Sequence, residues 1–503
     1  MQIKFPPLVH NRISYVGTAV AILAAIVFGF LVILHTFTDA ARAPYAPLLI
    51  FIFVPAVMLF GFVLIPIGML VERRHVQRTG VRSIAKFPVI DFNDARQRNF
   101  IAIFVVASVV LLFLAVFGGF QAYEATESVA FCGTLCHSAM QPEYVTYQNS
   151  PHARVKCVDC HVGPGAQWYV KSKMSGLYQV YAVTFNKYPR PITGPITSLR
   201  PAQQTCEQCH WPEQFFEAQE KRLVHYLPDE NNTRWEIDLA IKTGGGKPGV
   251  GRSGGIHWHM NIQNRVEYIA TDAARQEIPW FRMTNRVTGE SKEYMSTVNP
   301  LSDEARAKAT IRTMDCMDCH NRPSHIFRAP RESVNTALTF GRIDPTLPFI
   351  KKTAVELLAA EYPSTEVATA AIADGLRAFY QQNYPDVMAK RQDQVTKAIA
   401  ELQDVYQHNF FPSMKARWDL YPNNVGHLIF PGCFRCHDNQ HQSADGKVVS
   451  KDCTLCHTIT AQGKTTEMAF ATDRRGMTFQ HPEDIGDAWQ EMACYDCHKG
   501  TLP

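Results

Sequence analysis

The sequence predicts a mainly α-helical protein with three N-terminal transmembrane helices, little regular structure outside its helices, and a small β-containing insertion. Three observations lead to this fold class. Three long apolar stretches open the 503-residue chain. Seven pairs of cysteines, each followed at once by a histidine, are spread over the rest. Between the third and fourth pairs, a cysteine-free segment becomes turn-rich and partly alternating.

The apolar stretches cover residues 13–37, 47–71 and 100–120. Each is long enough to cross the bilayer core as an α-helix, which satisfies its own backbone hydrogen bonds. The first is also compatible with a signal peptide, but its apolar run is too long for a usual h-region and no small-x-small cleavage site follows. We interpret residues 1–120 as a three-span anchor in the lipid bilayer.

The loop at residues 72–98 is strongly basic, with seven arginines or lysines against three acidic residues. Basic loops stay in the cytoplasm, so this loop and the N-terminus are expected there. The third span then delivers everything after residue 120 to the outer face. The predicted location is a bacterial inner (cytoplasmic) membrane, with the rest of the chain in the periplasm.

The fourteen cysteines form seven pairs with none left over. The motifs are Cys132/Cys136/His137, Cys157/Cys160/His161, Cys206/Cys209/His210, Cys316/Cys319/His320, Cys433/Cys436/His437, Cys453/Cys456/His457 and Cys494/Cys497/His498. Such a motif attaches a c-type haem, because the thiols bond the porphyrin and the histidine binds the iron. Zinc ribbons, redox dithiols and disulfides are the alternatives for a single motif. Seven motifs from seven pairs favour seven covalently bound haem c groups, and haem attachment takes place on the periplasmic side.

The predicted protein is therefore a haem-packed multihaem cytochrome c, in which porphyrins supply apolar mass and the peptide wraps around them. We predict a four-haem domain at residues 121–330, interrupted by an insertion at 211–312. The insertion is turn-rich at 243–255 and then alternates β-branched and aromatic residues in part. Residues 331–412 are expected to form a helical arm, and residues 413–503 a C-terminal three-haem module.

Each iron that binds two axial ligands needs one from outside its motif; histidine pairs lower the reduction potential and methionine raises it. Nine histidines outside the motifs and the membrane region are available: His152, His225, His257, His259, His325, His408, His427, His441 and His481. We expect His427, His441 and His481 to serve the three C-terminal motifs, which they flank. His257 and His259 would point the same way on a strand. His257 is the candidate for the fourth iron, with His259 and His225 as competitors, and His408 has a helix-capping role as its alternative.

Three segments, YQNSPHARVKCVDCHVGPG, LRPAQQTCEQCHWP and CMDCHNRPSH, resemble the NapC/NirT family of membrane-anchored multihaem quinol dehydrogenases. With three spans and seven motifs, the chain is most similar to the larger inner-membrane cytochromes of that family. The resemblance covers residues 120–330, whereas the C-terminal motifs resemble small bis-histidine trihaem cytochromes. The typical family member has one span, four haems and no insertion.

The resemblance implies axial ligands for three haems. The family binds the membrane-proximal iron through a methionine just after the motif, which corresponds to Met140. The histidine before the second motif serves the third haem, which points to His152. The histidine five residues past the fourth motif serves the second haem, which points to His325. The wider Cys132–Cys136 spacing departs from the family pattern at the first haem.

The resemblance also implies a quinol site beside the first haem, with Met140 next to it. Oxidation of a quinol releases two protons with its two electrons, so a base must lie near the hydroxyl group. Family members place a lysine and an acid after the second motif. The matching segment offers Lys171, Lys173 and Gln179 but no carboxylate, so Glu143 is the candidate acid. The alternative is that both lysines contact lipid headgroups.

We predict a membrane-bound cytochrome that oxidises a quinol, with menaquinol as the first candidate, and passes electrons to a periplasmic cytochrome or reductase. Such a quinol dehydrogenase makes and breaks no bond in that acceptor. Nucleic acid is not expected among its partners. Two alternatives are a terminal multihaem reductase, whose open haem would lie in the insertion, and an electron-wire subunit of a larger respiratory complex.

Overall fold

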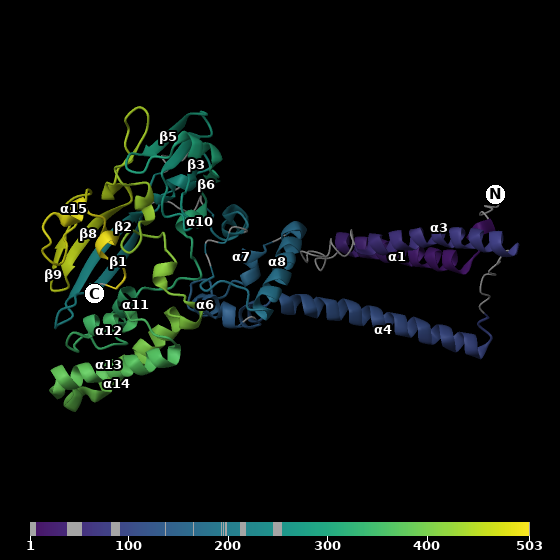
Figure 1. Cartoon of the computed structure of the whole chain (residues 1–503), viewed down its shortest axis with the longest axis horizontal. Coiled ribbons are helices and arrows are strands. Elements are labelled where there is room, and N and C mark those ends of the chain that lie inside the picture. The colour runs from purple at the N-terminus through teal and green to yellow at the C-terminus, as the bar shows by residue number, and fades with distance from the viewer. Residues whose placement is uncertain are drawn as a thin grey trace. The chain divides into compact units, whose positions relative to one another are not determined.

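The computed structural model describes residues 7–37, 53–81, 91–135, 137–163, 165–192, 194, 196, 199–211, 218–244 and 254–501. About half of the chain is helical, and the strands form antiparallel sheets. The chain divides into two compact units. The first comprises Met1–Glu127 with Val162–Leu177, and the second comprises Ser128–His161 with Tyr178–Pro503. Figure 1 labels their elements.

The first unit contains two helices that are long and apolar enough to cross a membrane, among the residues that the structure describes. They are Arg12–Val32 within α1 (Arg12–Phe37) and the whole of α3 (Val54–Thr79). The two helices pack closely through glycine, because a Cβ atom at Gly17 would lie 2.7 Å from the carbonyl oxygen of Gly61. Small residues of this kind let apolar helices approach each other in a bilayer.

The third predicted span lies in α4 (Ala95–Thr126), a single helix of 32 residues. Its N-terminus is capped by the Asp94 side chain, which accepts a hydrogen bond from the Arg96 amide at 2.9 Å. Many side chains of α4 between residues 100 and 122 lie outside the described part of the structure. The described residues thus contain two helices that fit a membrane span, where the sequence predicted three.

The main hydrophobic core of the second unit is helical. It is built from α11 (Pro330–Thr339), α12 (Ile350–Ala359), α13 (Thr365–Asn383) and α14 (Pro385–Asn409). The apolar stripe of α14, from Val395 to Tyr406, is buried in this core at its three- and four-residue spacing. Pro385 suits the first turn, where no amide hydrogen is needed. In Figure 1 these helices lie together, α12 to α14 in green.

Two antiparallel sheets complete the second unit. One has the order β1-β2-β8-β9 and the other the order β6-β3-β4-β5-β7. Their strands are β1 (Ala218–Tyr226), β2 (Arg234–Lys242), β3 (Asn264–Ile269), β4 (Trp280–Asn285), β5 (Ser291–Ser296), β6 (Arg312–Thr313), β7 (His441–Gln442), β8 (His457–Lys464) and β9 (Glu467–Phe470). Each sheet therefore joins strands of the cysteine-free segment to strands that follow residue 440.

Most of the other elements are short, with α6 of 12 residues and α8 of 19 residues as the exceptions. The α-helices are α5 (Val129–Thr134), α6 (His137–Gln148), α7 (Cys157–His161), α8 (Ala166–Thr184), α9 (Asp303–Lys308), α10 (Cys316–Cys319), α15 (Ala488–Glu491) and α16 (Cys494–Cys497). The 3-10 turns are η1 (Pro7–Val9), η4 (Ala202–Gln204), η5 (Cys206–Gln208), η7 (Ile256–Met260), η8 (Pro412–Met414), η9 (Trp418–Leu420), η10 (Gly432–Arg435) and η11 (Cys453–Leu455). The strand predicted for His257 and His259 was wrong, because both residues lie in η7.

Candidate haem centres

The second to fifth and the seventh cysteine–histidine motifs each adopt one helical turn, whereas in the sixth motif the turn η11 ends at Leu455 and His457 begins β8. In the third, fourth, fifth and seventh motifs, the histidine amide donates a hydrogen bond of 2.8–3.1 Å to the carbonyl of the first cysteine. One turn places residues i, i+3 and i+4 on the same face, so both sulfurs and the imidazole face one direction. This is the arrangement that covalent attachment of one porphyrin needs. Cys136 and the side chain of His137, in the first motif, lie outside the described residues.

Cys209, in the third motif, lies at the protein surface. It lies just after η5 rather than within it, and both Cys209 and His210 are exposed. Its amide still donates a hydrogen bond of 3.1 Å to the carbonyl oxygen of Cys206, so the turn of the motif is kept. The cysteines with exposed side chains are Cys160, Cys209, Cys319, Cys453 and Cys497. An exposed thiol is accessible to the vinyl group of a porphyrin, so this exposure is compatible with attachment of haem.

The zinc and disulfide alternatives find no support in the described part of the chain. No disulfide joins the cysteines whose side chains the structure describes. No group of three or more histidine, cysteine, aspartate or glutamate side chains gathers there as a metal site would require.

Six motif histidines each face a histidine from another part of the chain. The ring-centroid distances are 6.0 Å for His152–His210, 6.3 Å for His161–His325, 6.3 Å for His257–His320, 6.0 Å for His259–His437, 6.2 Å for His427–His457 and 6.0 Å for His481–His498. Metal–imidazole bonds are about 2 Å and the ring centre lies about 1 Å further, so two imidazoles across one metal have centroids about 6 Å apart. The six distances fit two axial ligands on opposite faces of one iron.

Hydrogen bonds orient the rings that come from outside the motifs. The Nδ1 atoms of five of them lie near backbone carbonyl oxygens: His152 to Pro323 at 3.2 Å, His257 to Thr243 at 2.9 Å, His259 to Ile256 at 3.0 Å, His325 to Glu143 at 2.9 Å and His481 to Glu483 at 2.9 Å. A carbonyl only accepts, so in the first four of these rings Nδ1 carries the proton and Nε2 keeps its lone pair. Metal-bound histidines are typically oriented in this way. Nδ1 of His481 differs, because it also accepts a hydrogen bond of 3.3 Å from the Glu483 amide.

Burial keeps these imidazoles neutral and suited to bind iron. It lowers the pKa of His161, His259, His320 and His427. The Nδ1 atoms of His427 and His457 are buried and have no hydrogen-bond partner in the described chain. Buried polar atoms are rarely left unpaired in a complete protein. The donor set therefore fits a cofactor, haem, which supplies redox-active iron when bound.

The fold does not favour the predicted role of His441 as a ligand of the C-terminal haems, because both nitrogens of its ring are engaged. Nδ1 lies 2.9 Å from Oδ1 of Asp438 and Nε2 lies 2.7 Å from the carbonyl oxygen of Ile278. Burial opposes protonation, but these hydrogen bonds raise the pKa of His441 above its ordinary value. A ring that donates from both nitrogens has no lone pair for iron. His259 faces the fifth motif instead. The sequence suggested His259 only as a competitor for the fourth iron.

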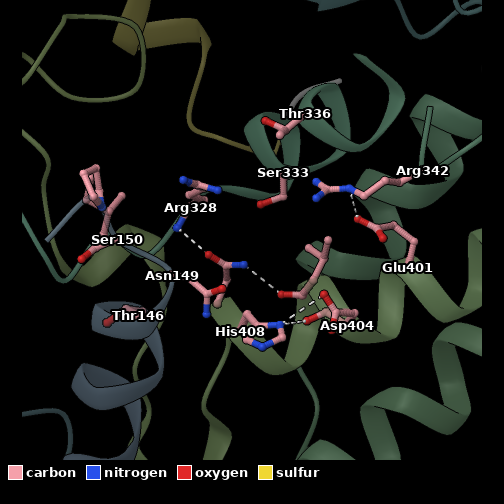
Figure 2. Close-up of a pocket in the computed structure, with 14 residues that line it drawn as sticks. Thr146, Asn149, Ser150, Arg328, Ser333, Thr336, Arg342, Glu401, Asp404 and His408 are labelled. Carbon is pink, nitrogen blue, oxygen red and sulfur yellow. Dashed lines mark hydrogen bonds and ion pairs between the residues drawn. The ribbon is translucent and has the colours of Figure 1, made fainter. Parts of the chain in front are cut away.

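The other two histidines considered as ligands, His225 and His408, do not face a motif histidine in the described part of the chain. His225 contacts Asn335, with 3.4 Å between its Nδ1 and the side-chain nitrogen. His408 ends α14, where its Nδ1 lies 2.8 Å from the carbonyl oxygen of Asp404. Figure 2 shows His408 at a cavity of about 110 Å³ between α6, α11 and α14. Arg342 and Glu401 form an ion pair of 2.8 Å at the same cavity. None of the residues that line it belongs to a cysteine–histidine motif.

Successive motifs are neighbours in space. The thiols of Cys132 and Cys157 lie next to each other, as do those of Cys206 and Cys316. Burial raises the pKa of four further thiols, and a neighbouring motif raises it further: Cys206 acts on Cys160, Cys433 on both Cys319 and Cys456, and Cys453 on Cys494. Once haem is attached, these sulfurs are thioethers and no longer titrate. The pKa shifts therefore show only that the cysteines of successive motifs lie close together. The seven motifs follow one another in chain order.

The candidate residues for the quinol site are found in different surroundings. Lys173 donates a hydrogen bond of 2.7 Å to Glu127 at the end of α4, and the Glu127 side chain is 4% exposed. Lys171 is exposed and lies 4.7 Å from the Trp168 ring centre, and Gln179 is also exposed. Met140 is half-buried in α6. Glu127 supplies the carboxylate that the segment after the second motif lacks.

Glu143 does not fit the predicted role of proton acceptor. Its carboxylate lies 3.2 Å from the guanidinium of Arg322 and 3.2 Å from Nδ1 of His325. Its backbone carbonyl oxygen is the one 2.9 Å from that same Nδ1. A carboxylate held by a guanidinium and an imidazole orients the histidine rather than serving as a free base. This contact could not be predicted from the sequence, because Glu143 and Arg322 are far apart along the chain.

Single-turn motifs with paired histidines, in a chain with helices that fit a membrane span, define a membrane-anchored multihaem c-type cytochrome that works in electron transfer. Residues 95–191 match the N-terminal region of the NapC/NirT cytochrome c family. The chain is also 44% identical over 490 residues to the cytochrome c-type protein ImcH of Geobacter sulfurreducens, across 97% of this chain and 95% of that relative. It belongs to the NapC/NirT family and binds haem c covalently. No solved structure matches it.

Proposed function

We propose that this cytochrome oxidises a quinol, with menaquinol as the first candidate, at the outer face of the inner membrane. Electrons then pass through seven haems to a periplasmic cytochrome or reductase. The ion pair of Glu127 and Lys173 carries this proposal, since it places a buried carboxylate five residues before Cys132 in the chain. The two helices that fit a membrane span and the basic loop at residues 72–98 support the orientation.

We assign the steps of quinol oxidation to residues that are close to the first motif in sequence or that contact such residues. Two electrons and two protons leave the quinol, and the electrons pass singly to iron. In this proposal the Glu127 carboxylate accepts a hydroxyl proton, and the hydrogen bond of 2.7 Å from Lys173 holds that carboxylate in position beforehand. Met140 is the proposed second ligand of the first iron, together with His137. Its thioether would raise the reduction potential of that haem and favour electron uptake.

The ring pairs define the proposed route beyond the first haem. We assign His325, His152, His257, His259, His427 and His481 as the second axial ligands of the second to seventh irons, in the order His161, His210, His320, His437, His457 and His498. All six are histidine pairs, which lower the reduction potential. The succession of neighbouring motifs supports an unbranched path in chain order.

The proposed activity can be tested with the full chain in liposomes that contain a menaquinol analogue. We expect the haem absorption bands to become ferrous when the analogue is added, without any second subunit. A preparation that only dithionite reduces would contradict quinol oxidation and favour the wire-subunit alternative. A high-spin band that is reoxidised by a small nitrogen oxide would favour the reductase alternative.

We expect Met140→Leu to abolish reduction by the quinol analogue while dithionite still reduces all haems. Leucine occupies a similar volume but has no sulfur to bind iron, so the first haem alone would lose a ligand. Stopped-flow absorption would measure both reductions. Met174→Leu is the matched control, because Met174 is 63% exposed and we assign it no ligand role. Unchanged quinol reduction in Met140→Leu would place electron uptake elsewhere.

The haem count has a separate test. We expect the mass of the purified protein to exceed that of the 503-residue chain by seven haem groups. Replacing Cys453 and Cys456 together by alanine should remove one of them, because these thiols form the covalent links of the sixth motif. Intact-protein mass spectrometry measures both. A mass that is unchanged by the double substitution would remove the sixth motif from the list of haem sites.

A further inference from the structure

The cysteine-free segment is joined by backbone pairing to the C-terminal part of the chain. In one sheet, β2 pairs with β8 from Trp235↔Lys464 to Ile241↔His457, the histidine of the sixth motif. In the other sheet, β5 pairs with β7 through Met295↔Gln442 and Ser296↔His441. The segment is thus built into the part of the second unit that holds the fifth and sixth motifs.

A single 3-10 turn of this segment serves two motifs. In η7, His257 faces His320 of the fourth motif at 6.3 Å, and His259 faces His437 of the fifth motif at 6.0 Å. A 3-10 turn advances three residues per turn, so side chains two positions apart point in different directions. One short turn therefore reaches two separate imidazoles, which a strand with both side chains on one face would not do.

The residues between the cysteines of these two motifs also interlock. Arg435, from the fifth motif, is 8% exposed and donates hydrogen bonds to the carbonyl oxygens of Asp318 at 2.7 Å, Arg275 at 2.9 Å and Gly432 at 2.8 Å. Asp318 belongs to the fourth motif. Arginine is suited to this role because its planar guanidinium presents several donors in a fixed geometry.

Asp318 is itself held from the cysteine-free segment. Its side chain is 1% exposed and accepts hydrogen bonds from the hydroxyl group of Tyr268 at 2.6 Å and from Nε of Arg312 at 2.7 Å. Tyr268 lies in β3 and Arg312 in β6, which pair with each other. Buried polar networks whose members are all satisfied make a structure rigid. The fourth and fifth motifs thus share one rigid set of contacts.

We propose that residues 218–244 and 254–313 form a frame that holds the fourth and fifth haems at one fixed separation. His257 and His259 are the ligands in this frame, and Arg435 and Asp318 are positioning residues. Electrons then leave the four-haem part for the three-haem part without any docking movement. Because electron tunnelling falls steeply with distance, a fixed separation makes this step fast and uniform. The inference rests on the proposed ligand assignments and goes beyond them, since it gives the inserted segment a role.

The test compares Arg435→Gln with Arg435→Lys and with the control Arg342→Gln in the full-length holoprotein. Glutamine cannot bridge three carbonyl oxygens, so we expect quinol-driven reduction to split into two phases. Four of the seven haems, those of the first four motifs, should reduce at the wild-type rate and the other three at least tenfold more slowly. Arg435→Lys should give an intermediate rate, and Arg342→Gln a single phase. Arg342 pairs with Glu401, away from the motifs.

Two measurements separate the possible failures. Haem content and the low-spin spectrum show whether every haem of the variant is still attached and six-coordinate. Only a variant that keeps all seven haems in this form is used for the kinetic comparison. One fast phase in such a variant would overturn the frame. Arg435→Lys keeps the positive charge. If this variant also reduced all haems in a single phase at the wild-type rate, that result would overturn the proposed frame even if Arg435→Gln failed to fold. Absence of quinol reduction in the wild-type protein would instead contradict the proposed function.

Discussion

Replacement of His259 by leucine should change one haem from a low-spin, six-coordinate form to a high-spin, five-coordinate form. His259 faces His437 at 6.0 Å, and its Nδ1 lies 3.0 Å from the Ile256 carbonyl oxygen, so Nε2 is directed towards the proposed fifth iron. Leucine fills similar space and offers no lone pair. Loss of a histidine ligand should also raise the potential of that haem, so that it traps electrons before the last two haems.

The matched control for this prediction is His441→Leu. His441 is the histidine nearest to the fifth motif in sequence, but its nitrogens contact Asp438 and the Ile278 carbonyl oxygen. We expect His441→Leu to lower thermal stability, because a buried carbonyl and a carboxylate lose their partner, and to keep seven low-spin haems. Electronic absorption and electron paramagnetic resonance spectra distinguish the two variants. A high-spin haem in His441→Leu, but not in His259→Leu, would reverse the assignment.

Glu127→Gln should slow quinol-driven reduction by about 10²–10⁴-fold, which is the usual contribution of a general base. The amide keeps the shape of the carboxylate and a hydrogen bond to Lys173, but it cannot take up a proton. Dithionite reduction should be unaffected, since it bypasses the quinol. Stopped-flow measurements with the quinol analogue in liposomes give the rate. An equal slowing with dithionite would indicate structural damage rather than loss of a base.

The control for Glu127 lies one turn earlier on the same helix. Glu124 is exposed on α4, whereas the Glu127 side chain is 4% exposed and 2.7 Å from Lys173. We expect Glu124→Gln to reduce at the wild-type rate. Lys173→Met should be slower than wild type but faster than Glu127→Gln, because the lysine orients the base and does not replace it. A wild-type rate in Glu127→Gln would remove this carboxylate from the quinol site.

Much of the candidate site could be predicted from sequence because haem attachment is local chemistry. Each motif places two cysteines and a histidine within five or six residues, and in the second to fifth and the seventh motifs a single helical turn then brings them together. The segments around His152 and His325 carry a family resemblance, and the structure places these rings opposite His210 and His161, respectively. The periodic apolar stripe of α14 predicted a buried helix face for the same reason of local geometry.

The pairing of histidines across the chain depended on tertiary structure. His441 lies four residues after His437, and sequence proximity therefore favoured it over His259. The sheets instead bring the distant turn η7 to the fifth motif and leave His441 buried between Asp438 and Ile278. The roles assigned to Glu143 and Glu127 also depended on tertiary structure, because their ion-pair partners, Arg322 and Lys173, come from remote segments of the chain. The sequence by itself determined the number of cysteine–histidine motifs and the residues predicted to attach haem. Only the folded chain decided which imidazoles face each other, since that choice depends on strand pairing and burial between residues far apart in sequence.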